Sequence, residues 1–378
     1  MITILFATVN AGGNLPPEVG IGAELQRRGH SVRFLGHPGQ RSAVERSGLA
    51  FGAYPSGADY DPTLERSTLR GLRELTGVFA DPRITADVIA AARRDRADVL
   101  VVDCLLTGPL QEVTRAGLPV VSLVHTFWEF FERMTAGPVG GVLRLRGVHA
   151  RAALTAPALS IVTARRDLDP AGSVPPAVRH VGAVWQGIPT QAATGAGRPR
   201  ILVSLSTTWF PGQEQTLQAI LDAVAALPVD AVVTTGPAVP PGRLRVPRNA
   251  EVHSWLDHGP ELARASLVVG HGGHSTLMRA LSHGVPVLVL PMHPMLDQPM
   301  VGAAASRNGV GRSLSRKASP ETIGAAITAM LGDPALTAAA RRMGEDIRRA
   351  DGAVVAADLV EQFAAGRRAG GEEPVSPR

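Results

Sequence analysis

Cysteine, lysine and aromatic residues are scarce in this sequence, and the first two scarcities each exclude a class of protein. The single cysteine, Cys104, excludes a disulfide framework and a metal site built from several cysteines. Basic residues outnumber acidic ones by 38 to 33, but all except Lys317 are arginines scattered along the chain, which argues against a nucleic-acid-binding stripe. No apolar run approaches the roughly 20 residues of a membrane-spanning helix, and the first residues lack the basic segment of a signal peptide. We therefore expect a cytoplasmic protein with no membrane span and no nucleic-acid partner.

Length and composition indicate more than one folded domain. The chain has 378 residues, of which 45% are hydrophobic and 19% charged, so it can bury a large core. A strand, a glycine-rich turn, a helix and a second strand are predicted over residues 2–35. The same order of elements recurs over residues 201–233, which indicates two halves built in the same way.

Both halves also contain a strand followed at equal spacing by a Gly-x-Pro turn and another strand. The strand over 97–103 is followed 14 positions later by Gly117, and the strand over 267–270 is followed 14 positions later by Gly284. The strands are apolar throughout, which is typical of parallel sheets covered by helices on both faces. We predict an α/β fold of two doubly wound domains that face each other across a cleft, with ligands beyond the carboxyl ends of the strands.

The domain limits are predicted from composition. Residues 1–185 form the first domain and residues 201–365 the second. Residues 186–200 are rich in Gly, Pro, Thr and Ala without periodicity, which predicts a linker. Residues 366–378 are predicted to be a disordered tail.

The clearest functional motif follows the strand over 267–270. Residues 271–276 read His-Gly-Gly-His-Ser-Thr and open a helix, whose free amides and positive end favour an anion. The two glycines allow a ligand to approach the backbone closely. Ser275 and Thr276 add hydroxyl donors and His271 an imidazole donor, so the motif predicts phosphate binding.

Two further features flank this motif. Asp297 and Gln298 follow the next strand and offer a carboxylate and an amide, the groups suited to sugar hydroxyls; a helix cap is the alternative for Asp297. Trp255 lies upstream of the motif, where its indole could stack on a nucleobase or pack in a core.

Taken in order, Trp255, the turn at 271–276, the Gly-x-Pro strand at 284–286 and the Asp297–Gln298 pair resemble the donor site of the GT-B glycosyltransferases. The resemblance is to the inverting bacterial family that decorates antibiotics and macrolides, and it covers about the C-terminal half with high specificity. It implies two Rossmann-like domains and an enzyme of secondary metabolism. The co-substrate would be a TDP- or UDP-sugar, the acceptor a small hydrophobic aglycone, and the assembly a monomer or a homodimer.

The resemblance also assigns roles to residues of the C-terminal half. Each group of residues would hold one part of the donor. These are Trp255 and Leu256 for the base; His271, Gly273, Ser275 and Thr276 for the diphosphate; Asp297 and Gln298 for the sugar; and Ser206 and Thr207 in a loop that faces the same cleft.

The N-terminal half resembles the family less completely. Family members carry Gly-His-x-x-Pro after the first strand, with the histidine as general base, whereas Gly13 stands at that position here and Asn14 follows it. The partner aspartate has a counterpart in Asp103, and His125 ends the next strand. Either Asp103 or His125 is then the base, or the acceptor needs little deprotonation, as with an indole-type nitrogen or an activated aromatic carbon.

An aromatic cluster follows the same strand. Phe127, Trp128 and Phe131 are prominent in a chain with 4% aromatic residues, and we predict that they form an apolar wall for the acceptor; a role in the core is the alternative.

No metal site and no cofactor other than the donor are expected. Two Asp-x-Asp triplets, at 59–61 and 167–169, precede proline and are typical of turns or caps. Two other functions fit the same fold. One is a nucleotide-sugar 2-epimerase, which would need a second acid near Asp297. The other is a non-catalytic helper of another transferase, favoured by the missing histidine at Gly13.

Overall fold

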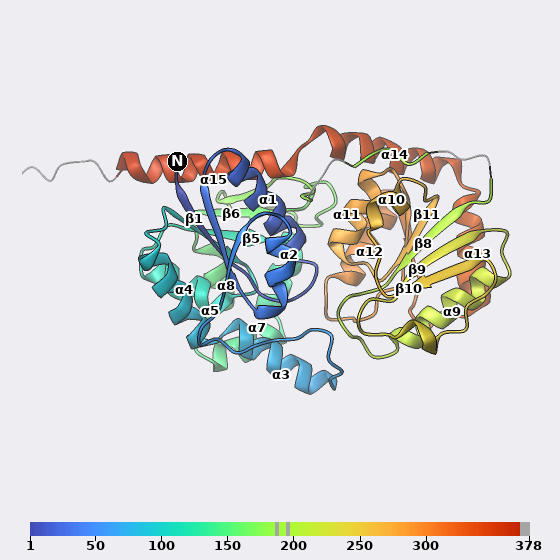
Figure 1. The fold of residues 1–378 in the computed structure, drawn as a ribbon, viewed down its shortest axis with the longest axis horizontal. Coiled ribbons are helices and arrows are strands. Elements are labelled where there is room, and N and C mark those ends of the chain that lie inside the picture. Colours follow the sequence, from blue (N-terminus) through green and yellow to red (C-terminus); the bar gives the residue numbers. More distant parts are fainter. Residues whose placement is uncertain (186–188, 194–196, 371–378) are drawn as a thin grey trace, which may run out of the picture. The chain divides into compact units, whose positions relative to one another are not determined.

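The structure is a computed structural model that describes residues 1–185, 189–193 and 197–370, and it divides into two compact units (Figure 1). Unit 1 comprises the described residues within 1–61, 66–186 and 351–378, and unit 2 those within 62–65 and 187–350. Each unit has its own parallel sheet with helices on its faces, which confirms the predicted pair of doubly wound α/β domains.

Unit 1 is built on seven parallel strands, in the order β3-β2-β1-β4-β5-β6-β7. The strands are β1 (Thr3–Ala7), β2 (Ser31–Gly36), β3 (Ala50–Ala53), β4 (Val99–Asp103), β5 (Val120–Val124), β6 (Leu159–Val162) and β7 (Val178–His180). The helices are α1 (Leu15–Arg27), α2 (Arg41–Glu45), α3 (Thr68–Phe79), α4 (Pro82–Arg94), α5 (Thr107–Arg115), α6 (Trp128–Ala136), α7 (Pro138–Leu145), α8 (Ala150–Thr155) and α15 (Gly352–Gly370).

Unit 2 repeats the plan with six parallel strands, in the order β10-β9-β8-β11-β12-β13. The strands are β8 (Arg200–Ser204), β9 (Asp230–Thr234), β10 (Ala250–His253), β11 (Leu267–Gly270), β12 (Val287–Val289) and β13 (Gly311–Ser313). The helices are α9 (Gln213–Ala225), α10 (His258–Leu262), α11 (His274–Ser282), α12 (Gln298–Arg307), α13 (Pro320–Leu331) and α14 (Pro334–Arg349).

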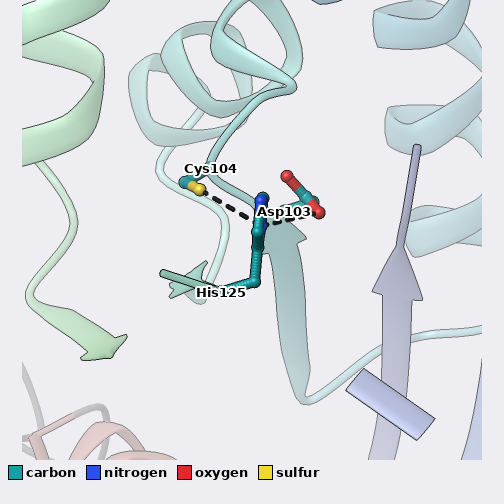
Figure 2. Close-up of side chains that lie close together, drawn as sticks. All are labelled: Asp103, Cys104 and His125. Atoms are coloured by element: carbon teal, nitrogen blue, oxygen red, sulfur yellow. Dashed lines mark hydrogen bonds and ion pairs between the residues drawn. The ribbon is translucent and has the colours of Figure 1, made fainter. Parts of the chain in front are cut away.

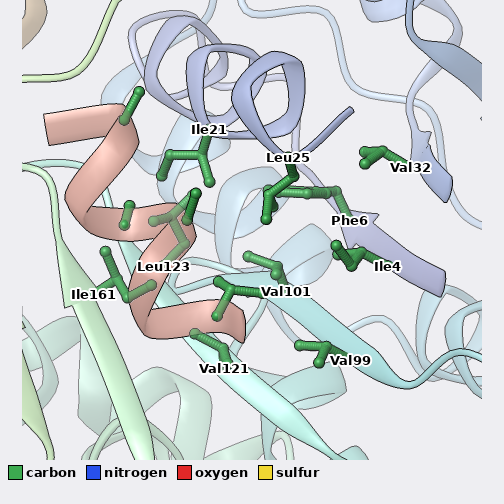
Figure 3. Close-up of a cluster of buried hydrophobic side chains, with 14 of the residues drawn as sticks. Ile4, Phe6, Ile21, Leu25, Val32, Val99, Val101, Val121, Leu123 and Ile161 are labelled. Atoms are coloured by element: carbon green, nitrogen blue, oxygen red, sulfur yellow. The ribbon is translucent and has the colours of Figure 1, made fainter. Parts of the chain in front are cut away.

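The core of unit 1 lies between one face of its sheet and helices α1 and α15 (Figure 3). Alternate residues of the central strands point into it, such as Ile4 and Phe6 on β1 and Val99 and Val101 on β4, because successive side chains of a strand face opposite sides. The rings of Phe6 and Phe34 stack with their centroids 4.6 Å apart. This apolar layer fixes the strand ends that carry the polar residues described below.

The last helix corrects the predicted domain limits. Residues 351–365 belong to unit 1 and not to the second domain, because Ala356, Ala357 and Val360 of α15 are fully buried in the core of unit 1. Arg28 of α1 reinforces this packing with ion pairs of 2.6 Å to Asp358 and 2.7 Å to Glu361.

The predicted tail and linker differ from the structure in part. The tail was expected to begin at 366, but α15 continues to Gly370; residues 371–378 lie outside the described residues. Within the linker, residues 186–188 and 194–196 also lie outside them, and the amide of Ala192 donates to the carbonyl of His283 in unit 2. Among helices of the described ranges, none taken singly is long and apolar enough to cross a membrane; the bent pair 320–331 with 334–368 meets the length and composition criteria only jointly.

Candidate active site

In each unit, the predicted site residues follow the carboxyl ends of the strands, around the point where the order of strands reverses. In unit 1, β1 lies between β2 and β4, and in unit 2, β8 lies between β9 and β11. The loops that follow β1 and β8 carry Asn14 and Ser206, while Asp103 ends β4 and His271 follows β11. Ligands of doubly wound sheets bind at such a reversal, so each unit contributes one candidate subsite.

The unit 2 subsite is the N-terminus of α11. Gly273 is the N-cap, and the amides of His274, Ser275 and Thr276 occupy the first helical turn, whose N–H groups have no partner within the helix. The side chains of Ser275 and Thr276 are half-buried. This end of the helix can therefore bind an anion through backbone amides and two hydroxyls.

The two glycines of the motif are required by close approach. A Cβ on Gly273 would lie 2.6 Å from Nε2 of His271, so the imidazole covers the position where a side chain would stand. Gly272 has φ +86°, and a Cβ there would lie 2.7 Å from Val289 and 2.9 Å from the carbonyl oxygen of Gln298. The turn thus brings His271 into contact with the start of α11 and lets the start of α12 pack against Gly272.

His271 is uncharged at neutral pH in this environment. Burial lowers the pKa of its imidazole to about 4, and Nδ1 is buried with no hydrogen-bond partner among the described residues. A neutral imidazole beside a helix N-terminus can donate one N–H to an anionic oxygen without first carrying a charge of its own.

The remaining residues predicted to bind the sugar donor differ in how far their side chains are exposed to solvent. Trp255 follows β10 and is 73% exposed, Thr207 is exposed, and Leu256 and Asp297 are half-buried. Gln298 is 2% exposed, and its Oε1 accepts from the amides of Met292 (2.7 Å) and His293 (3.0 Å). The acceptor atom of Gln298 therefore holds the loop before α12, a role that sequence reasoning missed.

The loop after β8 is also internally bonded. Ser206 Oγ accepts from the amide of Thr208 at 3.0 Å, and a Cβ on Gly236 would lie 2.7 Å from the carbonyl oxygen of Ser206. The loops after β8 and β9 are therefore packed together, which fixes the backbone of Ser206 and Thr207. Since β11 is the other neighbour of β8 in the sheet, this backbone and the loop after β11 follow adjacent strands.

The unit 1 subsite centres on Asp103, which is fully buried at the end of β4. Its Oδ1 accepts from the amide of Leu105 at 2.8 Å, and its Oδ2 accepts from Nδ2 of Asn14 at 2.8 Å. Burial opposes ionisation, but the charge of His125 and hydrogen bonds to His125, Glu18 and the amide of Leu105 outweigh it and lower the pKa of Asp103. Asp103 is therefore an oriented carboxylate.

His125 and Cys104 complete a compact group with Asp103 (Figure 2). Nδ1 of His125 lies 3.5 Å from Oδ2 of Asp103 and 3.7 Å from Sγ of Cys104, and the imidazole packs edge-on against Phe131 at a centroid distance of 5.6 Å. The His125 side chain retains 14% exposure. With Nδ1 turned to the carboxylate, Nε2 is the ring nitrogen that can take a proton.

The side chains of Asp103, Cys104 and His125 are of types that bind metals, and their ligand atoms lie within 4.8 Å of one another. However, both oxygens of Asp103 already accept hydrogen bonds from N–H groups, and burial followed by the charge of Asp103 raises the pKa of the Cys104 thiol well above its ordinary value. The group is thus better suited to proton transfer than to holding an ion.

The other acceptor predictions have mixed outcomes. A Cβ on Gly13 would meet no atom within 4 Å, so the position that carries histidine in the resembling family is open space. Asn14 is buried and its amide donates to Asp103, so it orients that carboxylate; contact with an acceptor stays a prediction. Phe127, Trp128 and Phe131 are at most 1% exposed, so they form part of the core instead of an open wall, the alternative weighed above.

Comparison with known proteins agrees with this arrangement. Residues 218–361 match the family described as erythromycin biosynthesis protein CIII-like, C-terminal domain. The chain is 27% identical to 4'-demethylrebeccamycin synthase of Lentzea aerocolonigenes, over 95% of this chain and 98% of the relative. It is also 27% identical to O-mycaminosyltylonolide 6-deoxyallosyltransferase of Streptomyces fradiae, over 96% and 97%. Over nearly its whole length, the chain is therefore similar to these two enzymes.

Solved structures show that the chain has the GT-B fold. The calicheamicin glycosyltransferase CalG4 aligns over 100% of both chains with a TM-score of 0.76 and 24% identity. The glycosyltransferase VinC, solved in complex with dTDP, aligns over 96% of this chain and 100% of its own with a TM-score of 0.70 and 20% identity.

One polar residue of the unit 1 subsite was not predicted from the sequence. Glu18 of α1 is 1% exposed and lies beside Asp103 and Asn14. An acidic residue in a first helical turn is ordinarily explained by the helix dipole. Its spacing of three from Ile21 and seven from Leu25, both buried, places it on the apolar face, and that signal could have identified it.

Proposed function

We propose that the protein transfers a sugar from a nucleoside diphosphate donor, TDP- or UDP-linked, to a small hydrophobic natural-product acceptor. Transfer proceeds with inversion by single displacement and needs neither a metal nor another cofactor. The observation that carries this proposal is the Gly-Gly turn that begins α11, with the neutral His271 in contact with Gly273.

In this proposal the start of α11 binds the diphosphate. The amides of residues 274–276, the hydroxyls of Ser275 and Thr276 and an N–H of His271 stabilise the negative charge that develops as the diphosphate leaves. Preorganised N–H and O–H groups of this kind can stabilise the leaving diphosphate in place of a metal ion. Trp255 stacks on the base, and Asp297 binds sugar hydroxyls.

The acceptor reacts at the unit 1 subsite. Asp103 holds the proton on Nδ1 of His125, so Nε2 accepts the proton that the attacking group of the acceptor loses. Open space at Gly13 supports this assignment, since nothing at position 13 can supply the base. The pair of Asp103 and His125 also argues against a non-catalytic helper, because a helper needs no oriented carboxylate and imidazole.

The test combines donor binding with turnover. Calorimetry with TDP- and UDP-sugars should show binding, and release of nucleoside diphosphate should depend on an aglycone and be unaffected by EDTA. A product with inverted anomeric configuration by NMR would support single displacement. Donor conversion without acceptor would favour the epimerase, binding without transfer to any aglycone would favour the helper, and loss of activity in EDTA restored by magnesium would overturn metal independence.

A further inference from the structure

We propose that Glu18 is a positioning residue of the unit 1 subsite, which stays protonated and donates a hydrogen bond to Asp103, so that Asp103 remains the anion that orients His125. The inference rests on the proposed function only for the role of His125. The protonation of Glu18 stands on the contacts of unit 1 alone.

The surroundings of Glu18 do not accommodate a negative charge. The side chain is buried, and its one hydrogen bond from a nitrogen donor is a long one, 3.4 Å from Nδ2 of Asn14 to Oε1. As a carboxylate, Glu18 would leave Oε2 buried with no partner. The titratable groups that face it are Asp103, Cys104 and Tyr54, none of which is a cation. An unpaired carboxylate in such a place is strongly destabilised.

A proton on Glu18 satisfies these contacts. Nδ2 of Asn14 lies 2.8 Å from Oδ2 of Asp103 and 3.4 Å from Oε1 of Glu18, so the two carboxyls are neighbours around one amide. A protonated Glu18 supplies the O–H that can join them. Burial and then the charge of Asp103 raise the pKa of Glu18 well above its ordinary value, in agreement with the geometry. Two adjacent buried carboxyls thus share one proton and carry one negative charge.

That charge resides on Asp103 because Asp103 has the better donors. It receives two N–H bonds of 2.8 Å, from Leu105 and Asn14, and faces Nδ1 of His125. Among the described residues, Glu18 has one long N–H contact, 3.4 Å from Asn14, and the neutral hydroxyl of Thr8. Asn14 contacts both carboxyls and so fixes their relative placement. The arrangement keeps a single anion, and not two, directed at Nδ1 of His125.

Two substitutions test whether Glu18 acts as a neutral hydrogen-bond donor to Asp103. Glu18→Gln keeps the shape and supplies an N–H donor in place of the O–H, so kcat/KM should remain within about threefold of wild type with the same acid limb in its pH profile. Glu18→Leu removes the donor. Asp103 should then bind the proton of His125 more tightly, which should lower kcat/KM about tenfold and move the acid limb to higher pH.

Either of two results would overturn the proposal. Loss of activity in Glu18→Gln equal to that in Glu18→Leu would mean that the acid itself is needed, and an unchanged rate and acid limb in Glu18→Leu would mean that Glu18 has no role. Infrared spectroscopy gives a readout that does not depend on transfer or on the folding of the leucine variant. The carbonyl stretch of a protonated carboxylic acid should be present in wild type at pH 7 and absent from Glu18→Gln. If no sugar is transferred but this band is found, the proposed function fails while the protonation of Glu18 stands; absence of the band overturns the inference.

Discussion

At the scale of single residues, His271 is the side chain on which the donor subsite depends most. Its imidazole lies against Gly273 at the start of α11 and is neutral above a pKa of about 4. We predict that His271→Ala lowers kcat/KM for the sugar donor at least about tenfold, because it removes a preorganised N–H group that stabilises the leaving diphosphate. Steady-state kinetics with a saturating acceptor measures this loss.

His283 provides a matched control for that substitution. It is also a buried histidine with a lowered pKa of about 4, but it caps the opposite end of α11. His283→Gln should therefore keep the donor kinetics of wild type. Equal losses in both variants would indicate a general effect on the helix and would remove His271 from the site.

At the scale of elements, α15 determines the integrity of unit 1. Val360 is fully buried in the core, while Val355 on the same helix is 40% exposed. Val360→Asp should lower the free energy of unfolding of unit 1 by roughly 3–5 kcal/mol, because it buries an unpaired charge. Val355→Asp should change it by less than about 0.5 kcal/mol. Urea unfolding of both variants checks the prediction, and equal stabilities would argue that α15 does not dock as described.

At the scale of the whole molecule, acid should destabilise unit 2. Burial, the largest cause in each case, lowers the pKa values of His258, His271 and His283 to about 4, whereas unfolded histidine titrates near 6.5. Between these values the unfolded chain binds protons that the folded unit does not, so the free energy of unfolding falls as pH falls through that window. Each histidine should contribute roughly 2 kcal/mol between pH 7 and pH 5.

Urea unfolding of the ligand-free protein at several pH values measures this dependence. Carboxylates with lowered pKa values, such as Asp257 and Asp333, also lose stabilising contacts in acid, so the histidine contribution must be isolated by difference. His283→Gln removes one titrating group, and its stability should depend less steeply on pH than that of wild type. An unchanged slope would contradict the prediction.

Local patterns sufficed to predict most elements and the donor motif. The apolar runs at 97–103 and 267–270 became central strands, and the Gly-Gly turn opened α11, because strand propensity, turn chemistry and helix capping are properties of neighbouring residues. The order of strands then follows from the βαβ connections. The structure confirms where this motif lies in the fold, whereas the binding of a donor stays a prediction for every residue assigned to it: Ser206, Thr207, Trp255, Leu256, His271, Gly273, Ser275, Thr276, Asp297 and Gln298.

The misassigned features all depend on residues distant in the chain. An apolar stripe on 353–364 predicts a buried helix face, but only the tertiary structure determines that the core it enters is that of unit 1. The residues next to Phe127 and Trp128 in the sequence do not show whether these side chains lie in the core or line an acceptor pocket, since a core and such a pocket are both apolar. The structure places them in the core.

Short stretches of neighbouring residues were enough to predict two parallel α/β units and a helix that begins after His-Gly-Gly, because strand and helix-start patterns are local; that this helix start binds an anion stays a prediction. The electrostatics of the unit 1 subsite, in contrast, depend on the tertiary structure. Glu18, Asp103 and His125 are 85 and 22 positions apart in turn, and their charges are set by burial and by donors that the fold of the β1, β4 and β5 ends brings together. Electrostatic environment is a property of contacts in space, so it cannot be read from spacing along the chain.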